Sequence, residues 1–122
     1  MKHRAGVYGR IWVRDDRELV QELTDHITYR LSGTFIRMVR ERGHRDISFS
    51  ASIYPCYINY PKEDYLELYK IAGASCIIGD VMFFAGHERW EHRYDKDTGR
   101  WTERCYDEDA GRWTDIGTLL DI

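Results

Sequence analysis

Acidic and histidine side chains in the second half of the chain are the residues best suited to metal or acid–base chemistry. His87, Glu88, Glu91 and His92 all carry groups that can ligate metal ions. The histidines are five positions apart, so a strand would place them on opposite faces and a helix would align them poorly. Cys105 could approach His92 from a neighbouring strand, but one such pair is not a zinc site. The spacing therefore predicts no bound metal.

A second acidic segment, Asp95-x-Asp97-x-Gly99, has the spacing that opens a calcium-binding loop. It lacks the oxygen ligand expected at the fifth position and the bidentate glutamate expected at the twelfth. Aspartate is also common in turns, because its side chain bonds the backbone two residues further on. These carboxylates therefore indicate turns rather than a calcium site.

Signatures of enzymatic catalysis are few. The chain has three cysteines and five histidines, but no recognised nucleophile motif, P-loop or GxGxxG sequence. Asp80 lies in an apolar neighbourhood and is the carboxylate whose pKa burial would most perturb. We expect a non-enzymatic protein without a cofactor. The alternative is a small enzyme that works through scattered residues such as His87, His92 or Asp80.

One predicted strand combines aromatic and arginine side chains on a single face. Small and apolar residues from Val7 to Val13 alternate with polar and aromatic ones, which predicts a strand with one buried face. The other face comprises Tyr8, Arg10, Trp12 and Arg14. With Arg37 and Arg40, this face could stack bases and contact the phosphates of a single nucleic-acid strand. The pI near 5.9 argues against that function, because nucleic-acid-binding domains are usually basic.

A ten-residue segment near the C-terminus occurs twice, and residues 94–103 return twelve positions later with seven identities. Each copy is an aromatic residue, an acidic turn closed by glycine, and then Arg-Trp-Thr. Consecutive β-hairpins have this pattern, with Gly99 and Gly111 supplying the positive φ of the turns. The repeats resemble the tyrosine–aspartate hairpins of large bacterial repeat proteins, and hairpin chemistry alone explains the likeness. The expected strands of this meander are 89–94, 100–106 and 112–117.

The meander offers two candidate partner-binding features. Trp90, Trp101 and Trp113 hold comparable positions in adjacent strands, so we expect them on one face as a cross-strand row. Core packing is the favoured interpretation of the row, because an exposed aromatic stripe is a solubility liability unless it is a site. The turn tips are expected to form an acidic comb that meets a basic groove on a partner, or else to be solvated turns. The predicted partner-binding residues are Asp95, Asp97, Asp107, Glu108, Asp109, Trp101 and Trp113.

Helical periodicity follows the first strand. Asp15 and Glu18 form a start that resembles a capping box, and leucine or isoleucine then recurs every four residues to Leu31. Ser32-Gly33-Thr34 either kinks this helix or separates it from a second helix that Gly43 would end. We therefore expect helical structure over residues 16–42.

The sequence predicts one α+β domain over residues 1–122, with a mostly antiparallel sheet packed against one long or kinked helix and one short helix. The other expected elements are strands near 6–14, 46–54 and 76–84 and a helix over 62–72. Within 76–84, Gly79-Asp80 is expected to be a two-residue turn or a bulge. Pro61 suits the first turn of the short helix.

Composition bounds the compartment and the partner. The cysteines are widely spaced and no apolar stretch is long enough to span a bilayer, so we expect a cytoplasmic protein without membrane contact. Abundant Tyr, Trp and Arg suit a protein-binding module whose partner is a host protein or complex. The narrower expectation is an inhibitor of a host defence complex, of the anti-CRISPR or anti-restriction type carried by phages and mobile elements. Single-stranded nucleic acid is the second choice of partner, and meander edges could also pair between chains to form a homodimer.

Overall fold

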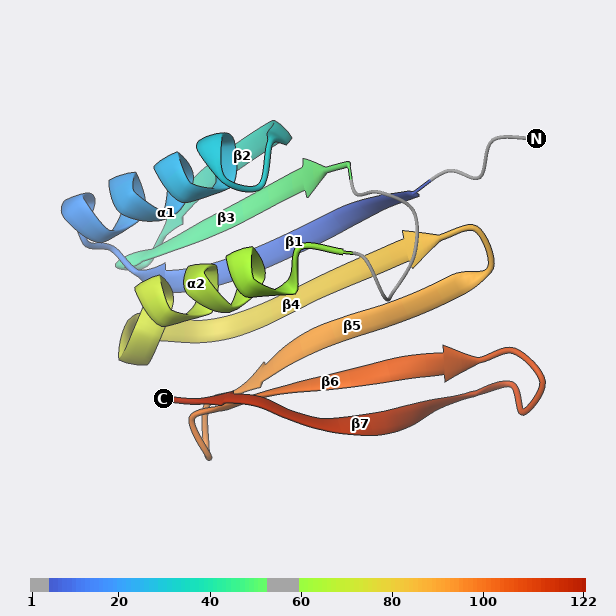
Figure 1. The fold of residues 1–122 in the computed structure, drawn as a ribbon. Helices are drawn as coiled ribbons and strands as arrows, with labels where there is room; N and C mark the ends of the chain where they lie inside the picture. The colour runs from blue at the N-terminus through green and yellow to red at the C-terminus, as the bar shows by residue number, and fades with distance from the viewer. Residues whose placement is uncertain (1–4, 53–59) are drawn as a thin grey trace.

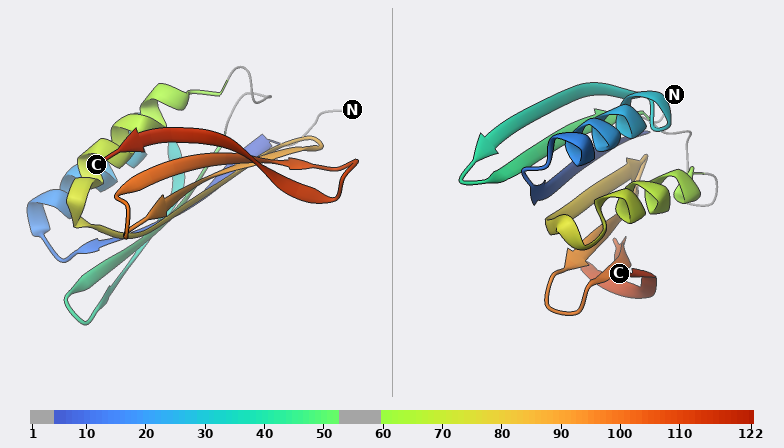
Figure 2. Two further views of the ribbon diagram at one scale, coloured as in Figure 1. Left: turned by 90° about the horizontal axis from the view of Figure 1, so that it is seen from below. Right: turned by 90° about the vertical axis from the view of Figure 1, so that its left-hand side faces the viewer.

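A computed structural model describes residues 5–52 and 60–122, which form one antiparallel sheet with two helices on one side (Figures 1 and 2). The seven strands follow the order β2-β3-β1-β4-β5-β6-β7, so the C-terminal half is the predicted meander. The elements are β1 (Ala5–Arg14), α1 (Arg17–Tyr29), β2 (Gly33–Glu41), β3 (His44–Ala51), α2 (Lys62–Ala72), a 3₁₀ turn (Gly73–Ser75), β4 (Cys76–Ala85), β5 (Glu88–Asp95), β6 (Arg100–Asp107) and β7 (Arg112–Asp121). The α+β architecture agrees with the sequence-based prediction. Neither described helix is long and apolar enough to cross a membrane.

The first helix is shorter than predicted. It begins after Asp16, whose Oδ1 accepts hydrogen bonds from the backbone N–H of Glu18 at 3.1 Å and of Leu19 at 3.2 Å. It ends at Tyr29, and the chain then reverses through Ser32, which has a positive φ of 54°. Asp16 is therefore the cap, and the predicted cap Asp15 is not.

The expectation of helix as far as residue 42 is wrong, because residues 33–41 form strand β2. Arg42 and Gly43 both have positive φ, at 48° and 81°, so they make the two-residue turn of a β2–β3 hairpin. Gly43 thus closes a hairpin rather than a helix. Pairing with the alternating strand β3 outweighs the helical spacing that 34–42 shows by itself.

Strand β4 runs through Gly79-Asp80 with regular pairing to Ile11 and Arg10, so the predicted turn or bulge at this dipeptide is wrong. A register shift between β1 and β4 lies further along, between Trp12 and Val13. The glycine is required by a close approach from β6, because a Cβ at position 79 would collide with the Trp101 indole. Trp101 in turn stacks on Tyr69 of α2, with ring centroids 3.8 Å apart and planes inclined by 7°. A single stack therefore joins α2, β6 and β4 in the core.

The tryptophan row is confirmed as core for two of its members and is wrong for the third. Trp90 and Trp101 are buried between sheet and helices, so Trp101, which was predicted to bind a partner, is not accessible to one. Trp113 is partly exposed and lies opposite Tyr106 on the other face. Next to the β6–β7 turn, from Arg104 to Asp107, directly paired residues share a face but one number is even and the other odd, and the repeat period of twelve is even. The two tryptophans of the repeat must therefore face opposite ways.

Candidate functional site on the uncovered face of the sheet

Both helices lie on one side of the sheet, and no helix of residues 5–52 or 60–122 covers the other side (Figure 2). We call this other side the open face. Strand β1 presents Tyr8, Arg10, Trp12 and Arg14 to it, while Val7, Ile11 and Val13 are buried beneath the helices. The predicted division of β1 into a buried and a polar face is confirmed. Directly paired positions of an antiparallel sheet share a face, so β3 and β4 extend this surface sideways.

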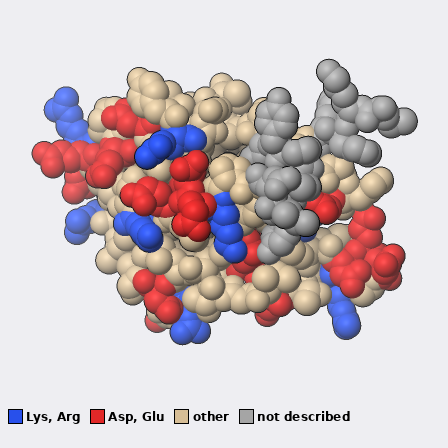
Figure 3. All heavy atoms as spheres, in the orientation of Figure 1, with Lys and Arg blue, Asp and Glu red and all other residues tan. Residues whose placement is uncertain are grey.

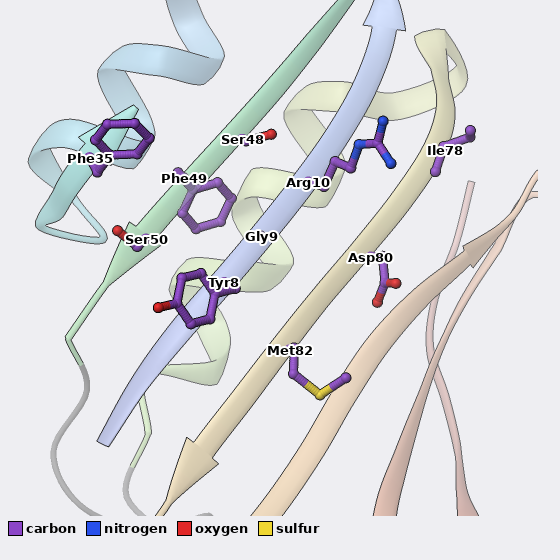
Figure 4. Close-up of a pocket in the computed structure, with 10 residues that line it drawn as sticks. All are labelled: Tyr8, Gly9, Arg10, Phe35, Ser48, Phe49, Ser50, Ile78, Asp80 and Met82. Atoms are coloured by element: carbon purple, nitrogen blue, oxygen red, sulfur yellow. The ribbon is translucent and has the colours of Figure 1, made fainter. Parts of the chain in front are cut away.

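A shallow hollow of about 430 Å³ lies at the centre of this half of the open face (Figure 4). Its apolar lining includes Tyr8, Phe35 and Ile78, whose residues are 65%, 60% and 41% exposed. Its remaining lining comes from Gly9, Arg10, Ser48, Phe49, Ser50, Asp80 and Met82. The hollow forms because β3 places two serines, Ser48 and Ser50, on the open face between the larger side chains of the rim. A small ligand in so open a hollow would stay largely exposed, whereas small-molecule sites usually bury most of the ligand surface.

The arginine of the hollow is already paired. The Arg10 guanidinium makes two hydrogen bonds to the Asp46 carboxylate, at 3.2 Å from Nε and 3.0 Å from Nη2. The hydrogen bond to Asp46, with the nearby charge of Asp80, raises the pKa of Arg10 above its ordinary value. Arg10 also lies over the Trp12 ring, 4.7 Å from its centroid. This arginine is therefore fixed in place and not free to bind a phosphate.

Arginines of the meander half of the open face are held in the same way. Arg104 forms an ion pair with the buried carboxylate of Glu91 and lies 4.8 Å from the centroid of the Trp113 ring. Arg100 is paired with Asp121 at 3.0 Å. Acidic and basic side chains are likewise interspersed on the helix-bearing side, which Figure 3 shows. The open face is thus rich in aromatic groups and close to electrically neutral.

Two arginines predicted to act together lie on opposite sides of β2. Arg37 is paired across the sheet with Ser48 and so belongs to the open face, whereas Arg40 pairs with Arg45 on the helix side. Arg40 also forms an ion pair with Asp15 at 3.1 Å. Residues three positions apart lie on one face of a helix but on opposite faces of a strand. The prediction that Arg37 and Arg40 act together therefore failed because residues 33–41 were expected to be helical.

The acidic turn tips lie far apart. Asp95 and Asp97 belong to the β5–β6 turn, and Asp107, Glu108 and Asp109 to the β6–β7 turn, at opposite ends of β6 (Figure 1). At about 3.3 Å per residue, β6 separates these ends by roughly 23 Å. Asp95 and Asp107 also cap their own turns, accepting hydrogen bonds from backbone N–H groups at 2.9 and 3.0 Å. The tips therefore cannot form one continuous acidic comb.

A buried polar cluster joins α2 to the meander. His92 lies at the centre of the cluster. Its Nδ1 is hydrogen-bonded to the Tyr69 hydroxyl at 2.6 Å, and its Nε2 to the Glu103 carboxylate at 2.8 Å. The Tyr60 hydroxyl donates to Glu103 at 2.6 Å, and Lys62 approaches the same carboxylate at 3.7 Å. His92 and Glu103 are 0% and 1% exposed. The cluster is closed to substrates, so its role is to join the helix to the sheet.

Burial dominates the ionisation of this cluster. Desolvation lowers the pKa of His92, against the opposing effect of its hydrogen bond to Glu103. Burial also raises the pKa of the Tyr69 hydroxyl well above its usual range, so the hydroxyl stays protonated. The sequence contained a signal for the pairing, because the hairpin turn at Gly99 sets His92 opposite Glu103.

The residues proposed for a scattered enzymatic site are not brought together. His92 is in the core, Asp80 lies on the open face, and His87 lies in the β4–β5 turn with Nδ1 3.9 Å from Glu108. Among the residues that the structure describes, no cluster of three His, Cys, Asp or Glu side chains could hold a metal ion. The geometry supplies no shared pocket for acid–base or metal chemistry among these groups.

Comparison with known proteins identifies no relative. No protein-family model matches the chain, and neither the curated proteins nor the solved structures give a significant match. Function is therefore inferred from the open face itself, which combines exposed aromatic groups, a hollow and three arginines paired with carboxylates.

Proposed function

We propose that this protein is a non-enzymatic protein-binding module that contacts its partner through the open face of the sheet. The observation that carries the proposal is the hollow, where Tyr8 and Phe35 stay more than half exposed beside a fixed Arg10–Asp46 pair. Aromatic side chains around a depression are typical anchors of protein interfaces, where a few residues supply most of the binding energy. Their exposure in an isolated monomer is otherwise a liability.

The pairing of charges supports a protein partner over a polyanion. A phosphate-binding surface needs arginines that are free to exchange counterions for phosphates. Here Arg10, Arg100 and Arg104 are each bonded to a carboxylate. An interface core, by contrast, favours aromatic residues and arginines whose charge is already compensated.

A pair of matched variants tests the proposal. The tagged protein is used to capture and identify a partner from host lysate treated with nuclease, and its affinity is then measured with purified components. Tyr8→Ser with Phe35→Ser should weaken binding by at least tenfold, because hot-spot truncations cost about 2 kcal/mol or more each. Tyr29→Ser is the control, since Tyr29 is 79% exposed at the end of α1, away from the hollow. Equal affinity of all three proteins would remove the open face as the binding surface.

The narrower form of the proposal is that the bound partner is a host defence complex that the protein inhibits in the cytoplasm. An inhibitor needs only a stable contact surface, which is the feature that the open face offers. The same Tyr8→Ser, Phe35→Ser variant should then lose inhibition of CRISPR interference or restriction in cells, while Tyr29→Ser retains it. Inhibition that persists in the double variant would separate the inhibitory activity from this surface.

Single-stranded nucleic acid is a second candidate partner, favoured by one observation. Tyr8, Trp12, Arg14 and Arg37 share the open face, where bases could stack and backbone phosphates could be contacted. Binding of this kind weakens steeply as salt rises. A fluorescent single-stranded oligonucleotide that fails to bind in low salt would exclude the candidate.

A further inference from the structure

The two edges of the sheet differ in regularity. Strand β2 forms one edge and pairs with β3 in unbroken register from Phe35 to Glu41. Strand β7 forms the other edge, and its register with β6 shifts twice, near Trp101 and near Glu103. Bulges and irregular register protect an edge from further pairing, whereas a regular edge strand is a template for another strand. Of the two edges, β2 is therefore the one able to accept a strand.

Strand β2 also leaves several of its large hydrophobic side chains exposed to solvent. Phe35, Met38 and Val39 are 60%, 46% and 38% exposed, and they are three of the eight large hydrophobic residues exposed in the described structure. Phe35 and Val39 face the open side, and Met38 faces the helix side. Both sides of the edge thus present apolar surface that an added strand would cover.

The charge of this edge specifies the partner. Arg37 and Arg42 are exposed and form no ion pair with any residue in 5–52 or 60–122, while Arg40 is engaged by Asp15. The open side of β2 therefore presents one arginine, Arg37, without an ion-pair partner among these residues, and the exposed Glu41 lies four residues further along the same side, at the turn. In an antiparallel β2–β2 pairing between two copies, registers that set Arg37 opposite Arg37 or Arg40 are destabilised by like charges. The register centred on Val39 sets Arg37 opposite Glu41, but it pairs only residues 37–41 and leaves Phe35 opposite Gly43 of the turn. An acidic strand from a different protein has the complementary charge.

We propose that β2 accepts an extended acidic segment of the partner protein by β-strand addition, which makes that segment the eighth strand of the sheet. Main-chain hydrogen bonds supply affinity in this mode, and alternate side chains supply specificity. On the open side, the added strand would set an acidic residue beside Arg37 and apolar residues two positions away, beside Phe35 and Val39. The inference rests on the proposed protein-binding function, and it gives that function a binding mode and a partner sequence pattern.

A synthetic peptide tests the edge without knowledge of the natural partner. The probe is the fluorescein-labelled peptide Thr-Val-Thr-Glu-Thr-Val-Thr with blocked ends. Its binding is measured by fluorescence anisotropy in low salt, and the protection of the protein's amides is measured by hydrogen exchange. We expect saturable binding that slows exchange of β2 amides and leaves β7 amides unchanged. A peptide N-methylated at alternate residues should not bind, because it cannot complete the ladder.

Charge exchange makes the assignment specific to Arg37. Replacing the central Glu of the peptide by Lys should weaken binding by roughly two- to fivefold, and Arg37→Glu in the protein should reverse the preference. Arg112→Glu on the opposite edge is the matched control and should change nothing. No binding of either peptide, binding without protection of β2, or equal binding of the N-methylated peptide would each overturn the proposal. Self-association of the protein with β2 protected would assign the edge to a second copy instead.

The hollow and the edge can fail separately. Tyr8→Ser removes an aromatic ring on β1 and leaves the β2 edge intact, so it should not change peptide binding. If the natural partner loses affinity for Tyr8→Ser but the peptides never protect β2, the open face stands and strand addition falls. If the peptides bind at β2 and the natural partner binds Tyr8→Ser as tightly as the wild type, the edge is the binding surface.

Discussion

The two faces of the sheet use the same residue types with opposite results. On the helix side, Trp101 stacks on Tyr69 and the His92–Glu103 pair is sealed from water. On the open side, Trp113 and the Arg10–Asp46 pair remain within reach of solvent. The covering helices therefore seal these groups on the helix side, whereas on the open side the same residue types, except the buried Glu91, are available for contact.

The largest expected difference is between the two tryptophans of the repeat. Trp101→Ala should lower the free energy of unfolding by about 3–5 kcal/mol, because it removes a fully buried indole and leaves a cavity. Trp113→Ala should cost about 1 kcal/mol, the loss of exposed contacts with Arg104 and Tyr106. Urea unfolding of both variants measures the contrast. Similar losses for the two would mean that Trp113 is also buried in the native protein.

A smaller change in the free energy of unfolding is expected when the pH is lowered, and it should come from the buried His92–Glu103 pair. Because the pKa of His92 is lowered in the folded state, its contribution to stability is complete above about pH 6.5, the value in unfolded chains, and is lost as the pH falls below that. The unfolded chain takes up a proton that the folded protein resists, which favours unfolding.

Urea unfolding at pH 7.5 and at pH 5.5 tests this sign. The wild type should lose more stability across that interval than His92→Gln, which has no imidazole to protonate. His87→Gln is the control, because His87 lies exposed in the β4–β5 turn and should follow the wild type. A pH dependence that is unchanged in His92→Gln would show that other groups control acid sensitivity.

The smallest effect is expected at the acidic turn tips. Reversing Asp97, Glu108 and Asp109 to lysine spares the two capping aspartates and should change stability by about 0.5 kcal/mol or less. If the open face is the binding surface, partner affinity should also change little at physiological salt. Reversing each tip separately distinguishes the alternatives: a large loss from one tip would locate the interface at that end of β6.

The sequence predicted strongly patterned elements well, and it failed where tertiary pairing overrides local spacing. Strict alternation identified β1 and β3, and the repeat identified the meander. Residues 33–41 have helical spacing of apolar groups, but pairing with β3 makes them a strand, which also moved Phe35 to the hollow and separated Arg37 from Arg40. Gly79 looked like a turn because nothing local indicates that an indole from a strand two places away covers it.

The candidate site on the open face could also be predicted only in part from the sequence. The polar face of β1 follows from alternation alone, so Tyr8, Arg10, Trp12 and Arg14 were found. That Arg10 is held by Asp46 depends on the register of β3, which the sequence does not specify. The acidic tips were judged by composition, yet the topology of a meander sends successive turns to opposite ends of the sheet.

The even period of the repeat has an evolutionary consequence. Two copies of a twelve-residue hairpin unit do not form equivalent strands, because the same position of the repeat lies on opposite faces of the sheet in the two copies. Selection on packing then acts on one tryptophan, and selection on recognition can act on the other. A duplication of such a unit would thus create, in a single event, one tryptophan held by core packing and one on the opposite face that packing leaves free to change.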